Sequence, residues 1–326
     1  MLRTRFDQSG QREDLNSAIS FHQEALELLA TSHPGRSGSL TGLAIALSRR
    51  FDQSGPREDL DSAISFHREA LELFPASHPH RSISLNNLAA VLSMRFDHSG
   101  QHQDLDSAIA FHREALELRA TPHPDRLNSL DNLAVALGKR FDQSGQREDL
   151  DSAISFHREA LKLRAAPCPD RSTSLNNLAV ALSTRFDRSG QLEDLESAIS
   201  FHQEALKLRA APHPERSNSL NSFAAPLSRR FNQSSQREDL DSAISFYQEA
   251  LEPLAAPHPD QLSSLNNLTL ALRTRFEFDQ SGEREDLNKA ASMLYEALDE
   301  LISGHPSICT LRQPRANPHE CILHHQ

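Results

Sequence analysis

The stretch SAISFHREALEL occupies residues 62–73, and close copies of it return through the chain. The copies begin at residues 17, 107, 152, 197 and 242, so that neighbouring copies are always 45 residues apart. Self-similarity at such a period indicates one supersecondary unit stacked on itself. The sequence of 326 residues therefore predicts a repeat array, in which each unit packs against its neighbours.

Each unit is expected to form two helices. The first is typified by RSISLNNLAAVLSMRF at residues 81–96, and the second by REDLDSAISFHREALEL at residues 57–73. In both, apolar residues recur every three or four positions, as on one face of a helix; in the first helix they are Leu85, Leu88, Leu92 and Phe96. Since no useful length alternates with period two, we predict an all-α fold of antiparallel helix pairs, an α-solenoid.

The segments that end the helices carry their own signals. Gly100 follows the first helix and suits a left-handed helix stop. An HP dipeptide such as the one in SHPHR, residues 77–81, precedes each new first helix. Pro226 stands in the middle of a first helix, where proline costs about 3 kcal/mol or kinks the helix, so we expect a distorted unit there. Pro253, near the end of a second helix, is expected to do less damage.

Ala63, Ala70 and Pro75 follow the pattern A-x(6)-A-x(4)-P, which resembles the second helix of a tetratricopeptide repeat (TPR). The motif LNNLA, at residues 85–89 and 175–179, is similar to the longer TPRs of kinesin light chain. The unit is 11 residues longer than a 34-residue TPR, and additions close to whole helical turns keep the apolar stripe in phase. The resemblance implies a right-handed superhelix whose first helices line a concave face.

The extent of the array follows from the repeat register. We predict a TPR-like array over residues 1–306, with a partial first helix, six helix pairs and a final half-repeat. Residues 307–326 are expected to form a disordered tail. Because neither end shows a polar cap, we expect a piece of a longer array or a truncated gene product. The uncapped ends also predict end-to-end self-association.

Composition excludes several classes of partner. The formal charge of −11 and the absence of Lys/Arg-rich runs argue against nucleic acid and anionic membranes. No apolar run has the roughly 20 residues that a membrane span needs, and the N-terminus has no signal-peptide core. Three cysteines form no disulfide framework, so we expect a reducing, cytoplasmic location.

A ladder of histidines in the second helices raises the question of a metal site, a pH sensor or plain packing. Equivalent residues of stacked repeats are separated by roughly 8–10 Å, whereas two nitrogens on one zinc lie about 4 Å apart at most. The same slot holds Tyr247 and Leu294 in the last copies. We therefore predict packing, with His67 buried in an aromatic slot. The ladder consists of His22, His67, His112, His157 and His202.

The other candidates for chemistry have structural explanations. The HP histidines, with Cys168 in one copy, are expected to start helices, and the repeated REDLD carboxylates to cap and solvate the second helices. The tail residues Cys309, His319 and Cys321 match no common zinc spacing. No phosphate-binding, nucleophile-elbow or zinc-protease motif occurs, so we expect no enzyme activity, no cofactor and no metal.

The remaining candidate is a binding groove on the first helices, opposite the leucine stripe. The matching asparagine of peptide-binding TPRs contacts the ligand backbone, which implies that role for Asn87, Asn132, Asn177 and Asn267. Alternatively, these asparagines link neighbouring repeats. Cations near the helix ends are predicted to add anion contacts; they are Arg95, Lys139, Arg140, Arg185 and Arg229.

These features predict a non-enzymatic scaffold that binds a peptide or partner protein. The repeats, with the motifs RFDQSG, EDLDSAI and HREALEL, also resemble TPR arrays of mushroom-forming fungi. In that family the array often accompanies a caspase-like (CHAT) peptidase domain or a nucleotide-binding module. The alternative function is therefore a regulatory or sensor array detached from such an effector.

Overall fold

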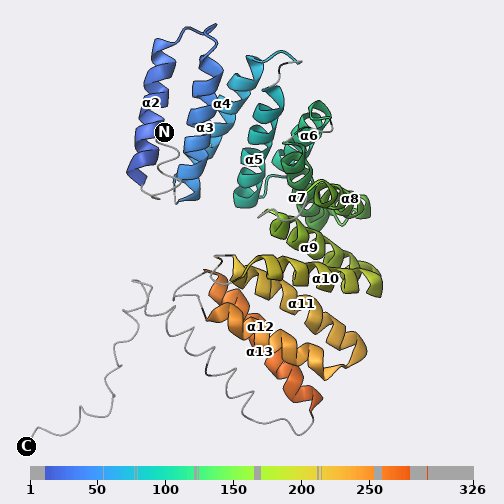
Figure 1. The fold of residues 1–326 in the computed structure, drawn as a ribbon. Helices are drawn as coiled ribbons and strands as arrows, with labels where there is room; N and C mark the ends of the chain where they lie inside the picture. The colour runs from blue at the N-terminus through green and yellow to red at the C-terminus, as the bar shows by residue number, and fades with distance from the viewer. Residues whose placement is uncertain are drawn as a thin grey trace, which may run out of the picture. The chain divides into compact units, whose positions relative to one another are not determined.

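The computed structural model describes residues 12–53, 55–76, 78, 80–120, 123, 125–164, 170–210, 213, 215–252, 259–279 and 292. Within these ranges the regular structure is helical, without a strand (Figure 1). The chain divides into two compact units, Met1–Ala181 and Leu182–Gln326. The helices are α2 (Arg12–Leu28), α3 (Arg36–Asp52), α4 (Glu58–Glu72), α5 (Arg81–Ser99), α6 (His102–Leu118), α7 (Arg126–Ser144), α8 (Arg147–Leu163), α9 (Arg171–Ser189), α10 (Leu192–Leu208), α11 (Arg216–Ser234), α12 (Arg237–Leu251) and α13 (Pro259–Phe278).

Two kinds of helix alternate along the chain, as the repeat predicts. The odd-numbered helices contain the LNNLA-type sequence and are called A helices below; the even-numbered ones contain SAISFH and are called B helices. The A helices α3, α5 and α11 each pack more extensively on the B helix that follows them than that B helix packs on the next A helix. The reason is the link: Gly100 and Gln101 alone separate α5 from α6, whereas seven residues separate α6 from α7. The predicted all-α fold of stacked helix pairs is confirmed.

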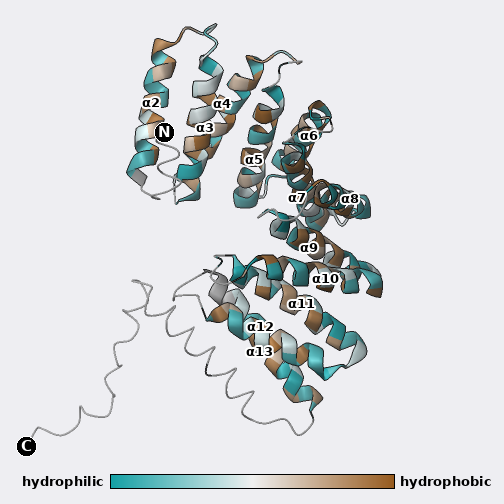
Figure 2. Cartoon of the chain, viewed as in Figure 1, coloured by the Kyte–Doolittle hydropathy of each residue, from teal (hydrophilic) through white to brown (hydrophobic). Residues whose placement is uncertain are grey.

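The core is built from the predicted apolar faces. In α5, the side chains of Leu85, Leu88 and Leu92 are fully buried, and in α6 Ala108 and Ala115 allow the helices to approach closely. Two buried clusters of this kind lie in the first unit and one in the second. Figure 2 shows the corresponding pattern, with apolar and polar residues interspersed along every helix. The helices are thus amphipathic, and packing on their neighbours stabilises them.

The helix stop predicted at Gly100 is confirmed. Gly100, Gly145 and Gly190 all have φ of 69°, in the left-handed region. Their N–H groups each donate to a phenylalanine carbonyl four residues earlier, at 2.7 Å. Ser235 occupies the same position with φ of 56°, where a residue with a Cβ pays about 1 kcal/mol that glycine does not.

Pro226 does not break its helix. It is buried within α11, which continues from Arg216 to Ser234 and has the same 19-residue length as α5. The proline ring removes only one backbone donor, the one that would bond to the carbonyl of Ser222. The expected distortion therefore does not interrupt the helix, although the local loss of a hydrogen bond remains.

Several predicted features lie outside the described residues. They are the partial helix at residues 1–6, the last B helix at about 285–302, the tail at 307–326, and Cys168, Pro253, His258, Leu294 and His305. The boundaries of the array at 1–306 therefore stay a prediction. Among the helices that are described, none is both long enough and apolar enough to cross a membrane.

Candidate functional site

The arginines near the ends of the A helices are held by internal ion pairs. Arg95 donates from Nε to Oδ2 and from Nη2 to Oδ1 of Asp104, both at 2.7 Å, and from Nη1 to Asp61 at 2.7 Å. The hydrogen bonds to Asp104 raise the pKa of Arg95. Equivalent bidentate pairs with a partner nine residues later occur at Arg50, Arg140, Arg185 and Arg230.

These pairs change two expectations from the sequence. The carboxylate of Asp104 and its equivalents are not solvated caps: Asp59, for example, is 4% exposed and no side-chain cap bond is made at the start of α4. That expectation is wrong for this position of the motif REDLD, because the preceding turn brings the arginine onto it. Arg95, Arg140 and Arg185 already pair with internal carboxylates, which leaves their guanidinium groups poorly suited to bind an anion in a groove.

The HP histidines organise the loops before the A helices, as predicted. The backbone N–H of Gly35 donates to Nδ1 of His33 at 3.0 Å, and that of Asp125 donates to Nδ1 of His123 at 3.1 Å. His78 and His213 accept in the same way from the residue two positions later. These rings therefore fix the turn at the helix start.

The histidine ladder is a buried packing position. His67, His112, His157 and His202 are at most 3% exposed, and Tyr247 is buried in the same slot; His22 is only half-buried. Burial lowers the pKa of His67, His112 and His202 to about 4, because the charged ring would lose its hydration. The packing prediction is confirmed for these four rings.

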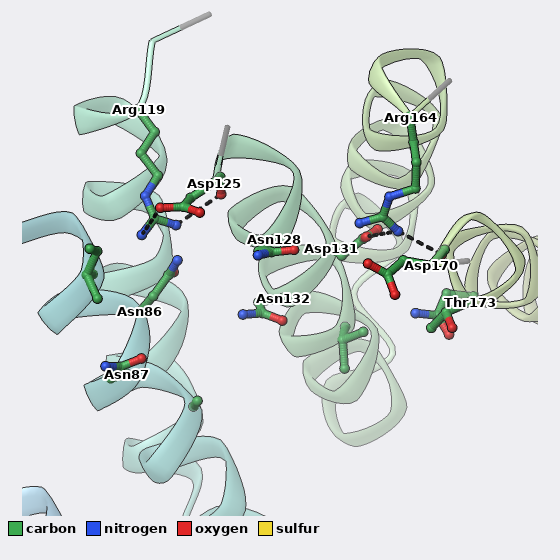
Figure 3. A pocket seen from close by; sticks show the side chains of 14 residues that line it. Asn86, Asn87, Arg119, Asp125, Asn128, Asp131, Asn132, Arg164, Asp170 and Thr173 are labelled. Carbon is green, nitrogen blue, oxygen red and sulfur yellow. Dashed lines mark hydrogen bonds and ion pairs between the residues drawn. The ribbon is translucent and has the colours of Figure 1, made fainter. Parts of the chain in front are cut away.

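A groove of about 570 Å³ in the first unit contains three of the predicted asparagines. Asn87, Asn132 and Asn177 lie at the same register of α5, α7 and α9, and all three line it. Figure 3 shows Asn87 and Asn132 on adjacent A helices, each extending from its helix into this space. Apolar side chains complete its walls, namely Ile83, Ala90 and Val135. We call this cavity the first-unit groove.

The three groove amides are unused within the described structure. The side chains of Asn87, Asn132 and Asn177 form no hydrogen bond with another described residue, and none of the three is fully buried. Each can therefore offer one acceptor and two donors to a ligand. This observation separates the two roles that the sequence left open for them.

The linking role belongs to the preceding residue. Asn86 Nδ2 donates to Ser129 Oγ at 3.0 Å, and Asn86 Oδ1 lies 2.9 Å from His112 Nδ1. This side chain of α5 thus joins the B helix of its own repeat to the next A helix. In the second unit Asn221 bonds to Ser264 in the same register. Asn86 was not among the predicted residues. Its neighbour in the NN doublet, Asn87, was the residue for which the linking role stood as an alternative.

The remaining predicted residues are Lys139, Arg229 and Asn267. Lys139 Nζ pairs with Asp97 on the neighbouring A helix at 2.5 Å, and Arg229 Nε pairs with Asp187 at 2.8 Å. Arg229 and the half-buried Asn267 belong to the second unit. None of these three lines the first-unit groove.

Two groove arginines were also missed. Arg119 and Arg164 follow the last residues of α6 and α8 and line the first-unit groove. The same register holds Leu29 and Phe74 in the earlier copies. That change from apolar to cationic residues was the available signal, but the arginines lie outside the helical stripe from which the groove was predicted.

Comparison with known proteins agrees with this repeat architecture. Residues 83–125, 126–165 and 171–215 each match the model of the tetratricopeptide repeat family. No curated protein matches the chain. The matched segments include α5 to α10 and all three asparagines of the first-unit groove.

Solved structures align with the chain at low sequence identity. A Signal Transduction ATPase with Numerous Domains (STAND) protein with a tetratricopeptide repeat sensor, from Pyrococcus horikoshii, aligns with a TM-score of 0.61 and 16% identity. The alignment covers 90% of this chain and 41% of that chain. BtubC (BKLC) from P. vanneervenii aligns with a TM-score of 0.49 and 19% identity, over 86% of this chain and 99% of that chain. TPR-like repeats from Podosopora anserina align with a TM-score of 0.48 and 20% identity, over 68% and 99%.

Proposed function

We propose that the chain is a non-enzymatic scaffold whose first-unit groove binds an extended segment of a partner protein. The match of residues 83–125, 126–165 and 171–215 to the tetratricopeptide repeat model supports this proposal. Repeats of this family generally mediate protein–protein interactions. The proposal places this interaction in the first-unit groove and assigns it to hydrogen bonds with the backbone of an extended segment.

The observation that carries the proposal is the row of unused amides. Asn87, Asn132 and Asn177 repeat along the groove with the period of the array, and none hydrogen-bonds to another described residue. An extended peptide presents backbone N–H and C=O groups at regular intervals. The amide of an asparagine can accept from such an N–H group and donate to such a C=O group at the same time. Ile83 and Val135 offer apolar contacts between the amides for side chains of the segment.

A second candidate is a sensor array that acts on an effector domain. The similarity to the Pyrococcus protein favours it, because that protein is a STAND ATPase with a tetratricopeptide repeat sensor. In this case the groove would bind the sensed ligand. Both candidates use the same groove residues and differ in what the bound chain controls.

Affinity purification with the full chain, followed by titration of the recovered partner, tests the proposal. We expect the double substitution Asn132→Ala and Asn177→Ala to weaken binding roughly 30-fold, since each lost hydrogen bond costs about 1 kcal/mol. Asn267→Ala, at the same register in α13, tests whether the asparagine predicted in the second unit contributes to the affinity as well. Unchanged affinity of the double variant, with helicity intact by circular dichroism, would remove the groove assignment.

A further inference from the structure

Three arginines occupy one register at the ends of consecutive B helices. Arg119, Arg164 and Arg209 follow α6, α8 and α10, and each is more than 90% buried. Each guanidinium donates from Nη1 to a serine hydroxyl ten residues later, Ser129, Ser174 or Ser219. A buried cation requires a counter-charge, so the carboxylates near these three arginines can be compared directly.

Two of the arginines have a close carboxylate. Arg164 Nη1 lies 3.2 Å from Oδ2 of Asp131, which reaches it from α7. In the second unit, Arg209 Nη2 lies 2.6 Å from Oε2 of Glu215, in the loop that follows. The two carboxylates come from different positions of the repeat, and each supplies the negative charge that burial demands.

Arg119 has neither of these partners. Asn86 stands at the register of Asp131, and its amide carries no charge. Asp125 stands at the register of Glu215, but its side chain is one methylene shorter, and its Oδ2 remains 3.9 Å from Nη2 of Arg119. No other described carboxylate lies within 4 Å of this guanidinium.

The donors of Arg119 can be counted one by one. Nε donates to Ser82 at 3.1 Å, and Nη1 donates to Ser129 at 2.7 Å and to the carbonyl of Asp125 at 3.0 Å. Nη2 has no hydrogen bond to any described residue. Burial lowers the pKa of Arg119, and Asp125 offsets this only in part, in keeping with a cation that lacks a full counter-charge.

The unmatched guanidinium faces the groove. Arg119 lines the first-unit groove together with Asn128 and Asn132 of α7. Figure 3 shows Arg119 beside Asp125, with the two asparagines on the facing side of the same space. An anion that enters here meets two N–H groups of Nη2 and the neighbouring amide donors.

We propose that Arg119 binds a carboxylate group from a ligand in the first-unit groove. This carboxylate would lie beside Arg119 as the carboxylate of Glu215 lies beside Arg209. Charge-assisted hydrogen bonds from a guanidinium to a carboxylate are short and strong, and the partly desolvated site strengthens them. The proposal rests on the proposed function only for the source of this group, which is then an acidic side chain of the bound segment. Asp125, at the rim, opposes the ligand by like charge.

The test is an NMR titration of the Nε–H resonance of Arg119 in the full chain. The probes are a blocked tripeptide with a central glutamate, its glutamine twin, and acetate. We expect saturable shifts with the glutamate peptide and none with the glutamine twin. If the glutamine peptide shifts the resonance equally, or the glutamate peptide leaves it unmoved, the proposal is overturned.

Four substitutions use the equivalent sites at Arg164 and Arg209 as controls. Asn86→Asp copies Asp131, and Asp125→Glu copies Glu215, so each should supply an internal carboxylate and weaken glutamate-peptide binding about 10-fold or more. Asp125→Asn should tighten it, and Asp131→Asn should make the Arg164 resonance respond as well. Affinity that is unchanged in Asn86→Asp and Asp125→Glu would overturn the assignment to Arg119.

The probes and variants also distinguish the carboxylate site from the proposed peptide groove. Equal affinity for acetate and the glutamate peptide assigns the carboxylate to a free small molecule and supports the site without the peptide groove. Tighter binding of the peptide, lost in the Asn132→Ala and Asn177→Ala variant, supports both. If the Arg119 resonance does not shift, but partner binding still depends on Asn132 and Asn177, only the carboxylate site is ruled out.

Discussion

His67 and His112 occupy the same position of consecutive repeats, yet their hydrogen bonding differs. Both rings are almost completely buried, at 0% and 2% exposure. His112 Nδ1 lies 2.9 Å from Asn86 Oδ1, whereas neither ring nitrogen of His67 has a hydrogen-bond partner. The repeat register therefore determines that the ring is buried, but it does not determine whether its polar atoms are satisfied.

The difference originates in the preceding A helix. Asn86, 26 residues before His112, reaches its ring, while Thr41 stands 26 residues before His67 and its side chain forms no hydrogen bond to a described residue. In the next repeat Asp131 lies 3.2 Å from His157 Nδ1. Burial in this array is thus set by the repeat register, whereas polar satisfaction depends on which residue the preceding A helix places 26 positions earlier.

The largest expected effect tests the shared burial. Replacing His67 with Asp places a carboxylate without a counter-charge in the core, and we expect the protein to lose about 4 kcal/mol or to unfold there. His67→Tyr is the matched control, because Tyr247 fills the same slot and bonds to Ser228, whose counterpart Ser48 is near His67. Urea unfolding followed by circular dichroism measures both. If the Asp variant unfolds at the midpoint of the parent, His67 is not buried.

Acid titration is the next test of the buried histidines. The pKa values of His67 and His112 are about 4 in the folded state and near 6.5 when unfolded, so the unfolded state binds more protons between these values. The stability that these two rings contribute is therefore full above pH 6.5 and falls as the pH decreases toward 4, by roughly 3 kcal/mol for each of the two.

The tyrosine variants provide the control for this pH dependence. His67→Tyr and His112→Tyr each remove one titrating ring, so the slope of unfolding free energy against pH should decrease between pH 4 and 6.5. Urea unfolding at a series of pH values gives this slope. The same slope in the parent and in the double variant would show that these rings are not the titrating groups.

A smaller effect tests the difference between the two repeats. Asn86→Ala removes the partner of His112 Nδ1 and of Ser129, so we expect a loss of about 2 kcal/mol. Thr41→Ala, at the same register one repeat earlier, should cost less than about 0.5 kcal/mol, because Thr41 has no such bond. Equal losses for the two variants would indicate that the Asn86 bonds contribute nothing to stability.

The helix periodicity made some of this arrangement predictable. Asn87 was correctly placed away from the leucine stripe, since one helical wheel is enough to assign a face. The linking role of Asn86 was not predictable in this way, because its partners lie 26 and 43 residues away. The same holds for Arg95, whose groove role depended on whether the following turn would bring Asp104 onto it.

The smallest effect is a gain of stability that would remove the difference altogether. Thr41→Asn copies Asn86, and it should place an amide between His67 and Ser84, which correspond in register to His112 and Ser129. Satisfying a buried ring nitrogen is expected to stabilise the protein by about 1 kcal/mol, seen as a higher urea midpoint. The gain should vanish in a His67→Phe background, where the ring offers no nitrogen to the new amide. If it persists there, the added stability comes from packing or from Ser84, and His67 does not depend on the preceding A helix for its partner.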